Sequence, residues 1–415
     1  MTKSFSFRTI LLYAFPIISW QAFMYVGFNM TILKALYFIL LPIMGLYTYK
    51  EFKNCKNSYI KKRFKQLTLV IVFSIVMSWL IWNQPISLGY RSTAPILSII
   101  FIFLLYKKKY TEKELRTFIN VQFFIYTILY LFALYKAPEI VFGFDTEKEL
   151  SDARGIFRIT IANRGFLFLS YFMFLNNWTS QHSKKYLCLA GLAFTLIIMT
   201  TIRQVIFWSF IISLIYLFRK WKYIWILSVL LIISANIFTI NVKNDSIIGS
   251  LINLTEEQVK DNKSGNTNVR FLEYEYYFTQ YSDNPLTWIL GNGQYHTDSS
   301  MGKNELKLND SYGFFQSDVG YARIYVQWGI IGLLLIITLF YYPLKFKFPS
   351  NLVFLKLYII YQIFTNIAGS WIWSEIITIC VTFYMIDCFA LSINKHSTTN
   401  NEIFNSNSRL QSQVS

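Results

Sequence analysis

Arginines stand at the edges of several long apolar runs and inside them, and their chemistry suggests an anionic ligand. The set comprises Arg91, Arg154, Arg158, Arg164, Arg203, Arg270 and Arg323. A guanidinium forms two parallel hydrogen bonds to phosphate oxygens and stays charged at physiological pH. Arginines that converge at a membrane surface would suit a ligand with a lipid tail and a diphosphate head, and they could neutralise a departing diphosphate without a metal. The alternative for any single arginine is that it snorkels to lipid phosphates.

Few residues near these arginines could transfer a proton. His296 suits a general acid or base, or is simply a solvent-facing loop residue. Asp318 lies close to Arg323 in sequence and either pairs with an arginine, orients a sugar hydroxyl or takes its proton. Glu375 lies near the outer end of the predicted span 371–390, between Trp373 and the apolar run that follows, where a carboxylate is costly unless it serves a site.

Aromatic residues are frequent in the polar segment that contains His296. They include Tyr274, Tyr276, Tyr277, Tyr281, Trp288, Tyr295 and Tyr312. Such rings stack on sugar faces, and they also anchor proteins at a membrane interface. The sequence leaves both explanations open.

Neither metal nor cofactor motifs are recognisable. The carboxylates Asp298, Asp310 and Asp318 lack the spacing of a calcium loop, and no His/Cys pair suits zinc. The four cysteines have no metal or redox spacing. Because a Walker loop and a dinucleotide fingerprint are also missing, we expect no metal and no cofactor.

The elements that must position these residues are membrane helices. The chain is 54% hydrophobic and only 15% charged, and its apolar residues form runs long enough to cross a bilayer as helices. The net charge of +17 would suit nucleic acid, but the lysines and arginines cluster between alternate apolar runs. That pattern is typical of cytoplasmic loops, so we expect an all-α polytopic membrane protein that does not bind nucleic acid.

We predict about 12 spans in one transmembrane domain that covers residues 1–391. The predicted spans are 9–28, 31–49, 66–83, 88–106, 117–135, 160–177, 186–201, 204–218, 223–241, 323–342, 352–368 and 371–390. This arrangement places the basic loops, such as Lys107-Lys108-Lys109 and Lys345-Phe346-Lys347, on one side together with both termini. The tail, 392–415, is rich in Asn and Ser and is predicted to be disordered in the cytoplasm.

Between predicted spans 9 and 10 lies a large extracytoplasmic loop, residues 242–322. Residues 268–281 have the pattern of an amphipathic helix, which Asn284-Pro285 is expected to end. Gly291-Asn292-Gly293 predicts a tight turn. We expect the chemistry between Arg270 and Arg323, with Arg164 and Arg203 approaching from the membrane side.

Three segments on this predicted outer side resemble one family when taken together. They are Thr201-Ile202-Arg203-Gln204; then Asn268-Val269-Arg270 followed by Asn284-Pro285 and Gly291-Asn292-Gly293; and Ser317-Asp318-Val319-Gly320-Tyr321 followed by Trp328-Gly329-Ile330-Ile331-Gly332. Their order and spacing resemble the O-antigen polymerase and ligase superfamily, which contains Wzy-type polymerases and related ligases. The likeness covers approximately residues 155–342.

The resemblance implies a GT-C-like architecture and transfer of glycan from an undecaprenyl-diphosphate carrier at the outer face of the bacterial inner membrane. The family's arginines bind the diphosphate and correspond by position to Arg203 and Arg270, and less closely to Arg164. Ligases of this superfamily carry a His-Asn pair where this chain has Ser317-Asp318, and His296 lies too far upstream to replace it. This departure favours a polymerase and leaves the general base unassigned.

The leading hypothesis is therefore a glycosyltransferase that polymerises lipid-linked oligosaccharide repeat units of a surface polysaccharide, whether O-antigen, capsule or another exopolysaccharide. Its predicted catalytic residues are Asp318 and His296, and its diphosphate ligands Arg203, Arg270, Arg164, Arg323, Arg158 and Arg91. Membrane lipid and a chain-length regulator protein are the expected partners. A ligase that transfers finished polymer is the alternative, and a flippase or exporter of lipid-linked oligosaccharide is a third hypothesis. A flippase, however, has no need of so large an external loop.

Overall fold

The computed structural model describes residues 7–20, 30–55, 58–137, 139, 141–142, 159, 161, 163–218 and 269–391. Its N-terminal part contains α1 (Phe7–Trp20), α2 (Met30–Lys53), α3 (Tyr59–Trp82), α4 (Ile86–Leu97), η1 (Ser98–Ile100), α5 (Phe101–Lys108), α6 (Glu112–Lys136), α7 (Gly165–Gln181), α8 (Lys184–Met199) and α9 (Arg203–Phe218). The predicted span 223–241, residues 242–268, Arg154, Arg158 and the tail 392–415 lie outside the described residues.

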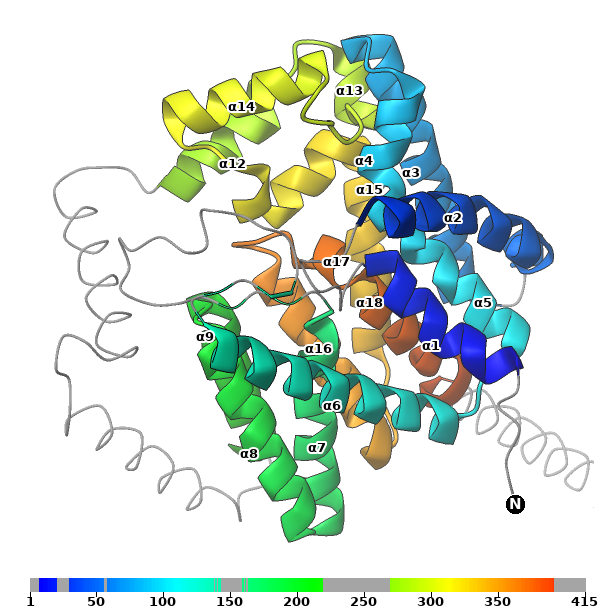
Figure 1. The fold of residues 1–415 in the computed structure, drawn as a ribbon, viewed down its shortest axis with the longest axis vertical. Helices are drawn as coiled ribbons and strands as arrows, with labels where there is room; N and C mark the ends of the chain where they lie inside the picture. Colours follow the sequence, from blue (N-terminus) through cyan, green and yellow to red (C-terminus); the bar gives the residue numbers. More distant parts are fainter. Residues whose placement is uncertain are drawn as a thin grey trace, which may run out of the picture.

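The C-terminal part contains α12 (Val269–Thr279), α13 (Pro285–Leu290), α14 (Ser300–Tyr312), η5 (Gln316–Asp318), α15 (Gly320–Tyr341), η6 (Tyr342–Lys345), η7 (Ser350–Leu352), α16 (Val353–Thr365), α17 (Trp371–Ser374), α18 (Ile376–Met385) and a π-helical turn, η8 (Ile386–Ala390). Figure 1 shows α12 and α14 toward one end of the molecule, the turn between α7 and α8 at the other, and α17 between them.

Long apolar helices confirm the predicted class, a helical membrane protein. Among the described residues, four helices are long and apolar enough to cross a membrane: 59–82, 86–108, 112–136 and 320–345. Shorter apolar helices cover 8–18, 203–218, 350–365 and 376–390. On α6, Phe124, Ile128 and Leu131 are 46%, 66% and 50% exposed, an apolar stripe that water would penalise and lipid would accommodate.

The lysine- and arginine-rich turns meet at one end of the structure, which we call the basic end (residues 47–61, 106–116 and 342–351). Tyr59 stacks on Tyr342 with ring centroids 4.1 Å apart, which joins the α2–α3 turn to the end of α15. The Arg116 guanidinium donates to the carbonyl of Asn351 at 2.7 Å, which joins α6 to η7. These turns lie far apart in sequence. Their cations share one region because the helices run back and forth.

The opposite end, which we call the loop end, contains the α3–α4 turn, α12 to α14, η5 and the loop between α16 and α17. The Trp82 indole N–H donates to Asn292 Oδ1 at 2.9 Å, and the Gln84 amide donates to the carbonyl of Gln294 at 2.9 Å. The Ser300 hydroxyl donates to the carbonyl of Trp82. These bonds fix the segment after α13 on the end of α3.

The helix α15 breaks at Gly329, and the Gly-Asn-Gly segment binds at the break. Gly329 has φ 63° and ψ −170°, a conformation essentially restricted to glycine. The break leaves helix carbonyls without their usual partners, and two of them accept from neighbouring backbone: Asn292 N–H to Val326 O at 2.7 Å, and Gly293 N–H to Gln327 O at 3.0 Å. A Cβ on Gly291 would collide with this backbone, which explains the glycine.

The predicted amphipathic helix is present as α12, but the segment after it differs from the expectation. Pro285 does not end that helix: α12 already ends at Thr279, and Pro285 begins α13, with the Asn284 side chain accepting from Leu286 N–H at 3.0 Å. Proline suits a first helical position because its missing N–H would have no helical partner there. The helix α14, capped by Ser299 and ended by Gly313 at φ 67°, was not predicted.

Candidate functional site

The loop between α16 and α17, residues 366–370, is the point where separate elements of the loop end meet. Ser370 N–H donates to the carbonyl of Ser317 at 2.9 Å, which ties the loop to η5. The Tyr274 hydroxyl donates to the carbonyl of Ile367 at 2.6 Å, which ties it to α12. A side chain at Gly369 would collide with Gln204, so the start of α9 lies against the same loop.

Arg323 lies in the first turn of α15 and binds this loop directly. Its guanidinium donates to Ser370 Oγ at 2.8 Å and lies 5.2 Å from the ring centroid of Trp373. The ring is itself fixed, because its N–H donates to Gln327 Oε1 at 3.0 Å and it stacks on Trp328 at 4.7 Å. A cation within about 6 Å of an indole face is attracted to it, so Trp373 holds the guanidinium in place.

Arg164 precedes α7 and is held in the same manner by the other tryptophan of α17. Its guanidinium lies 4.6 Å from the ring centroid of Trp371. The carboxylate of Glu375 is buried nearby and accepts from the Tyr358 hydroxyl at 2.6 Å and from the Gln362 amide. Glu375 and Thr378 also pack closely on Gly165, where a Cβ would lie 2.9 Å from Glu375 Oε2 and 2.7 Å from Thr378 Oγ1.

Among the described residues, neither of these two arginines, Arg164 and Arg323, forms an ion pair with a carboxylate within 4.0 Å. Both side chains are half-buried over tryptophans that are each 6% exposed. Two guanidinium groups therefore present positive charge at one loop, and that charge is available to an anion.

Arg203 and Arg270 begin the two helices that flank this loop. Arg203 is the first residue of α9 and follows a tight turn in which Thr201 has φ 56°. The same helix packs on α16 through Trp208 and Phe364, whose rings stack at 4.3 Å. Arg270 lies one helical turn before Tyr274, the residue that binds the loop. Both arginine side chains are exposed, and their neighbours Gln204 and Tyr274 contact residues 366–370. The elements that carry Arg164, Arg203, Arg270 and Arg323 therefore meet around this loop.

Asp318 lies beside this group without pairing to it. It ends η5, is half-buried, and accepts from the Ser317 hydroxyl at 3.2 Å. From the sequence we considered an ion pair between Asp318 and an arginine. In the described part of the chain this pair is not formed, and the Arg323 guanidinium donates to Ser370 Oγ instead. Its carboxylate is thus near the arginines and not neutralised by them.

His296 and Arg91 lie on another side of the loop end. The backbone N–H of His296 donates to Gln84 Oε1 at 2.9 Å, and its ring lies 3.5 Å from the carboxylate of Asp298. Arg91 is exposed on α4, next to Ser92, which donates to the carbonyl of Gln294 at 2.9 Å. These contacts join both residues to the α3–α4 turn, not to residues 366–370. Arg158 falls outside the described residues.

Sequence reasoning missed a buried polar chain that runs from α14 to α17. Gln316 Nε2 donates to Glu305 Oε1 at 2.6 Å, and Gln327 Nε2 donates to Gln316 Oε1 at 3.2 Å. Because Gln327 Oε1 accepts from Trp373, the chain ends beneath Arg323. The sequence signal for this buried chain is Gln327, a glutamine inside the apolar run of α15. Glu305 gives no such signal, because it lies in a polar helix whose composition is that of a solvent-exposed one.

A second buried carboxylate supports the loop end. Glu273 of α12 is 1% exposed and accepts from Phe315 N–H at 2.8 Å. Burial raises the pKa of Glu273 to about 7, since the Phe315 N–H and Arg270 only partly offset the desolvation. Burial likewise raises the pKa of Glu305. Both carboxyl groups lie close to the arginines and hold protons more readily than exposed ones.

One known family matches the part of the chain that contains most of these residues. The family model described as O-antigen ligase matches residues 185–337, which include Arg203, Arg270, Asp318 and Arg323. No curated protein matches the chain. With the apolar helices, the family match indicates an integral inner-membrane protein of O-antigen ligase or polymerase type that acts on lipid-linked polysaccharide. The match over residues 185–337 supports the assignment to the O-antigen polymerase and ligase superfamily that the sequence motifs predicted.

Proposed function

We propose that this protein is a polymerase of surface polysaccharide that joins oligosaccharide repeat units carried on undecaprenyl diphosphate. The observation that carries the proposal is the group of arginines around residues 366–370, two of which lie over tryptophan rings and pair with no described carboxylate. A diphosphate leaving group carries the negative charge that such a group would stabilise.

The reaction is a glycosyl transfer. A hydroxyl at the non-reducing end of one lipid-linked repeat attacks the anomeric carbon of the growing chain, and the bond from that carbon to the diphosphate oxygen breaks. The pair of electrons leaves with undecaprenyl diphosphate, and the arginines stabilise the charge that develops there. In this proposal Asp318 accepts the proton of the attacking hydroxyl. Its half-buried carboxylate forms no ion pair in the described part of the chain, which supports this role.

The arrangement in the membrane belongs to the same proposal. We place about 12 spans in a single domain, with both termini and the basic end in the cytoplasm, in line with the positive-inside rule. Residues 242–322 then form a loop at the outer face of the inner membrane, where lipid-linked repeats are available. The gathering of the basic turns at the end opposite residues 366–370 supports this orientation.

A ligase is the second candidate, because the matching family model carries that description. Ser317-Asp318 in place of the ligases' His-Asn pair favours the polymerase. The two activities leave different products when they are blocked. A blocked ligase leaves long chains on undecaprenyl diphosphate, whereas a blocked polymerase leaves single repeats.

Replacement of Arg203 tests the proposal. In a deletion strain complemented with Arg203→Ala, we expect single lipid-linked repeats and no long chains on a carbohydrate gel. Arg203→Lys should restore little, because an ammonium group cannot form the two parallel bonds. Arg63→Ala is the matched control, since Arg63 lies over Tyr59 at the basic end. Wild-type chain lengths with Arg203→Ala would refute the assignment, and long chains held on the carrier would indicate a ligase.

A further inference from the structure

Trp373, the ring over which Arg323 lies, is bonded to a group that could turn away from it. Its indole N–H donates to Gln327 Oε1 at 3.0 Å. A glutamine amide carries an oxygen that accepts and a nitrogen that donates, and rotation by half a turn exchanges the two. The rotated amide of Gln327 would present N–H to N–H, and the buried indole would lose its acceptor. The direction of this amide must therefore be fixed by a neighbouring group.

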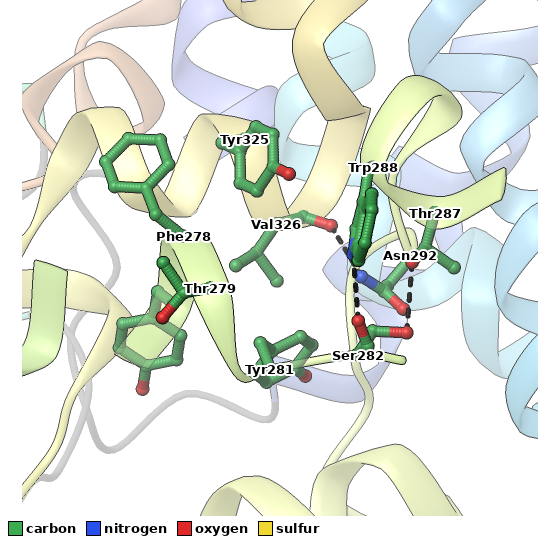
Figure 2. Close-up of a pocket in the computed structure, with 10 residues that line it drawn as sticks. Phe278, Thr279, Tyr281, Ser282, Thr287, Trp288, Asn292, Tyr325 and Val326 are labelled. Carbon is green, nitrogen blue, oxygen red and sulfur yellow. Dashed lines mark hydrogen bonds between the residues drawn. The ribbon is translucent and has the colours of Figure 1, made fainter. Parts of the chain in front are cut away.

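Trp288 shows an arrangement in which no such group is needed. Its indole N–H donates to the backbone carbonyl of Ser282 at 2.9 Å (Figure 2). A backbone carbonyl can only accept a hydrogen bond, so this contact has a single direction by itself. Trp288 is therefore the matched comparison for Trp373.

Glu305 ends the chain of hydrogen bonds that begins at Trp373. Gln327 Nε2 donates to Gln316 Oε1 at 3.2 Å, and Gln316 Nε2 donates to Glu305 Oε1 at 2.6 Å. An ionised carboxylate can only accept, whereas the indole at the other end can only donate. With an acceptor at one end and a donor at the other, only one direction of the two amides satisfies every member of the chain.

The position of Glu305 calls for such a role, because its surroundings are otherwise apolar. Met301 and Leu308 are buried four residues before it and three after it, on the same face of α14. Burial of a carboxylate is costly unless hydrogen bonds compensate for it. In the part of the chain that the structure describes, Glu305 forms no ion pair within 4.0 Å, although the charge of Arg323 acts on it. The bond from Gln316 therefore gives this buried carboxylate a purpose.

We propose that Glu305 is a positioning residue: through Gln316 and Gln327 it fixes the tryptophan that holds Arg323. The chain joins α14, η5, α15 and α17, so it connects the external helices to the arginine group. The inference rests on the proposed function for the task of Arg323. Because Glu305 is buried away from the substrate, its loss should weaken the binding of lipid-linked repeats more than the rate of transfer.

Kinetics in isolated membranes test the positioning. Glu305→Met has a similar length and no carboxylate to accept from Gln316. We expect the KM for lipid-linked repeats to rise roughly 2- to 10-fold, the value of one hydrogen bond, and kcat to change less. In a Trp373→Phe background, which has no indole N–H, the same change should add little, whereas in a Trp288→Phe background it should have its full effect.

Two kinetic results would overturn the proposal. One is an unchanged KM with Glu305→Met, and the other is an equal effect in the Trp373→Phe and Trp288→Phe backgrounds. Should Glu305→Met fail to fold, Gln316→Met breaks the same chain at its next member and is judged by the same outcomes.

Reversal of the chain tests it without any transfer reaction. Gln327→Glu places a carboxylate on each side of the Gln316 amide, so that the amide oxygen must face one of them. We expect the melting temperature of the full-length protein in lipid nanodiscs to fall by roughly 2–6 °C. Addition of Glu305→Gln should restore it, because the new amide donates to Gln316 and the chain runs the other way, with the Trp373 N–H still accepted at position 327.

Glu273→Gln is the control for this reversal, since it removes another buried carboxyl of the loop end that lies outside the chain. Added to Gln327→Glu, it should leave the melting temperature low. Equal recovery with Glu273→Gln, or no recovery with Glu305→Gln, would overturn the proposal. Failure of the proposed function is a separate result, namely long chains with Arg203→Ala, and it does not alter these melting temperatures.

Discussion

Cations lie over aromatic rings at both ends of the molecule, but in the described ranges Arg8 and Arg116 at the basic end also pair with carboxylates, whereas Arg164 and Arg323 at the loop end do not. Arg8 lies 2.7 Å from Glu114, and Arg116 lies 2.7 Å from Glu112. Arg164 and Arg323 instead lie over Trp371 and Trp373. Charges that pair with each other serve the fold and the membrane orientation. Charges held by neutral rings keep their capacity to bind an anion.

The carboxylates repeat this contrast. Glu114 accepts from Thr111 and Arg8, and although burial opposes them, these partners lower its pKa. Glu273 and Glu305 are each 1% exposed and bonded by the neutral groups Phe315 N–H and Gln316. In the described part of the chain, the loop end thus places these buried acids close to its arginines without an ion pair within 4.0 Å between them. Buried charges without a direct partner are unfavourable for stability and are expected where a ligand completes the charge balance.

The largest effect should come from Arg323→Lys. The variant keeps the charge and loses the planar group that binds Ser370 and lies over Trp373. We expect the initial rate of chain lengthening in isolated membranes to fall by about 100-fold or more, which is typical when a group that stabilises a transition state is removed. Arg116→Lys, the matched change at the basic end, should leave the rate near the wild-type value because a half-buried (i, i+4) ion pair far from the arginine group contributes little. Similar rates for the two variants would contradict the comparison.

A smaller effect is expected from the ring beneath Arg323. Trp373→Leu and Trp373→Phe both lose the hydrogen bond to Gln327, but only the leucine removes the aromatic face. A cation–π contact contributes about 0.5–2 kcal/mol, so the leucine variant should raise the KM for lipid-linked repeats roughly 3- to 30-fold above that of the phenylalanine variant. We expect kcat to change less. If leucine and phenylalanine give the same KM, the ring does not position the arginine.

The helices and the arginines were the predictable part of the molecule. A long apolar run predicts a helix because a segment that crosses lipid must satisfy its backbone N–H and C=O groups within itself. Every predicted span in the described ranges overlaps a helix. Arg203 and Arg270 stand in motifs of fixed order, so the resemblance predicts that they share a site, and that role stays a prediction. The number of spans and their orientation remain predictions.

Tertiary contacts account for what the sequence did not reveal. Residues 366–370 have no motif of their own, and their importance follows from bonds to Ser317, Tyr274 and Arg323 that join distant parts of the chain. Glu305 lies on a helix whose composition suggests exposure, and only the fold buries it. Pro285 is compatible with both the end and the start of a helix, so its local effect was ambiguous.

The smallest effect, a pH dependence of opposite sign at the two ends, would sharpen the comparison. Because the pKa of Glu273 is raised to about 7, its contribution to stability is complete below its ordinary value and is lost as the pH rises through about 7. The lowered pKa of Glu114 means that its contribution is lost as the pH falls. Hydrogen–deuterium exchange of α12 and α6, corrected for intrinsic rates, should therefore show α12 opening more at about pH 8 than at about pH 5.5. Over the same range α6 should change little, because Glu114 titrates only at lower pH.

Glu273→Gln isolates the group responsible, since the amide oxygen can still accept from Phe315 N–H. We expect the pH slope of α12 protection to flatten, with any remaining slope due to Glu305, and Glu114→Gln at the basic end to leave it unchanged. The slope is the decisive quantity, because the buried amide nitrogen of the variant can lower absolute stability at every pH alike. Parallel profiles for the wild type and Glu273→Gln would show that this carboxyl does not titrate with folding. The loop end would then not differ from the basic end in how it holds its acids.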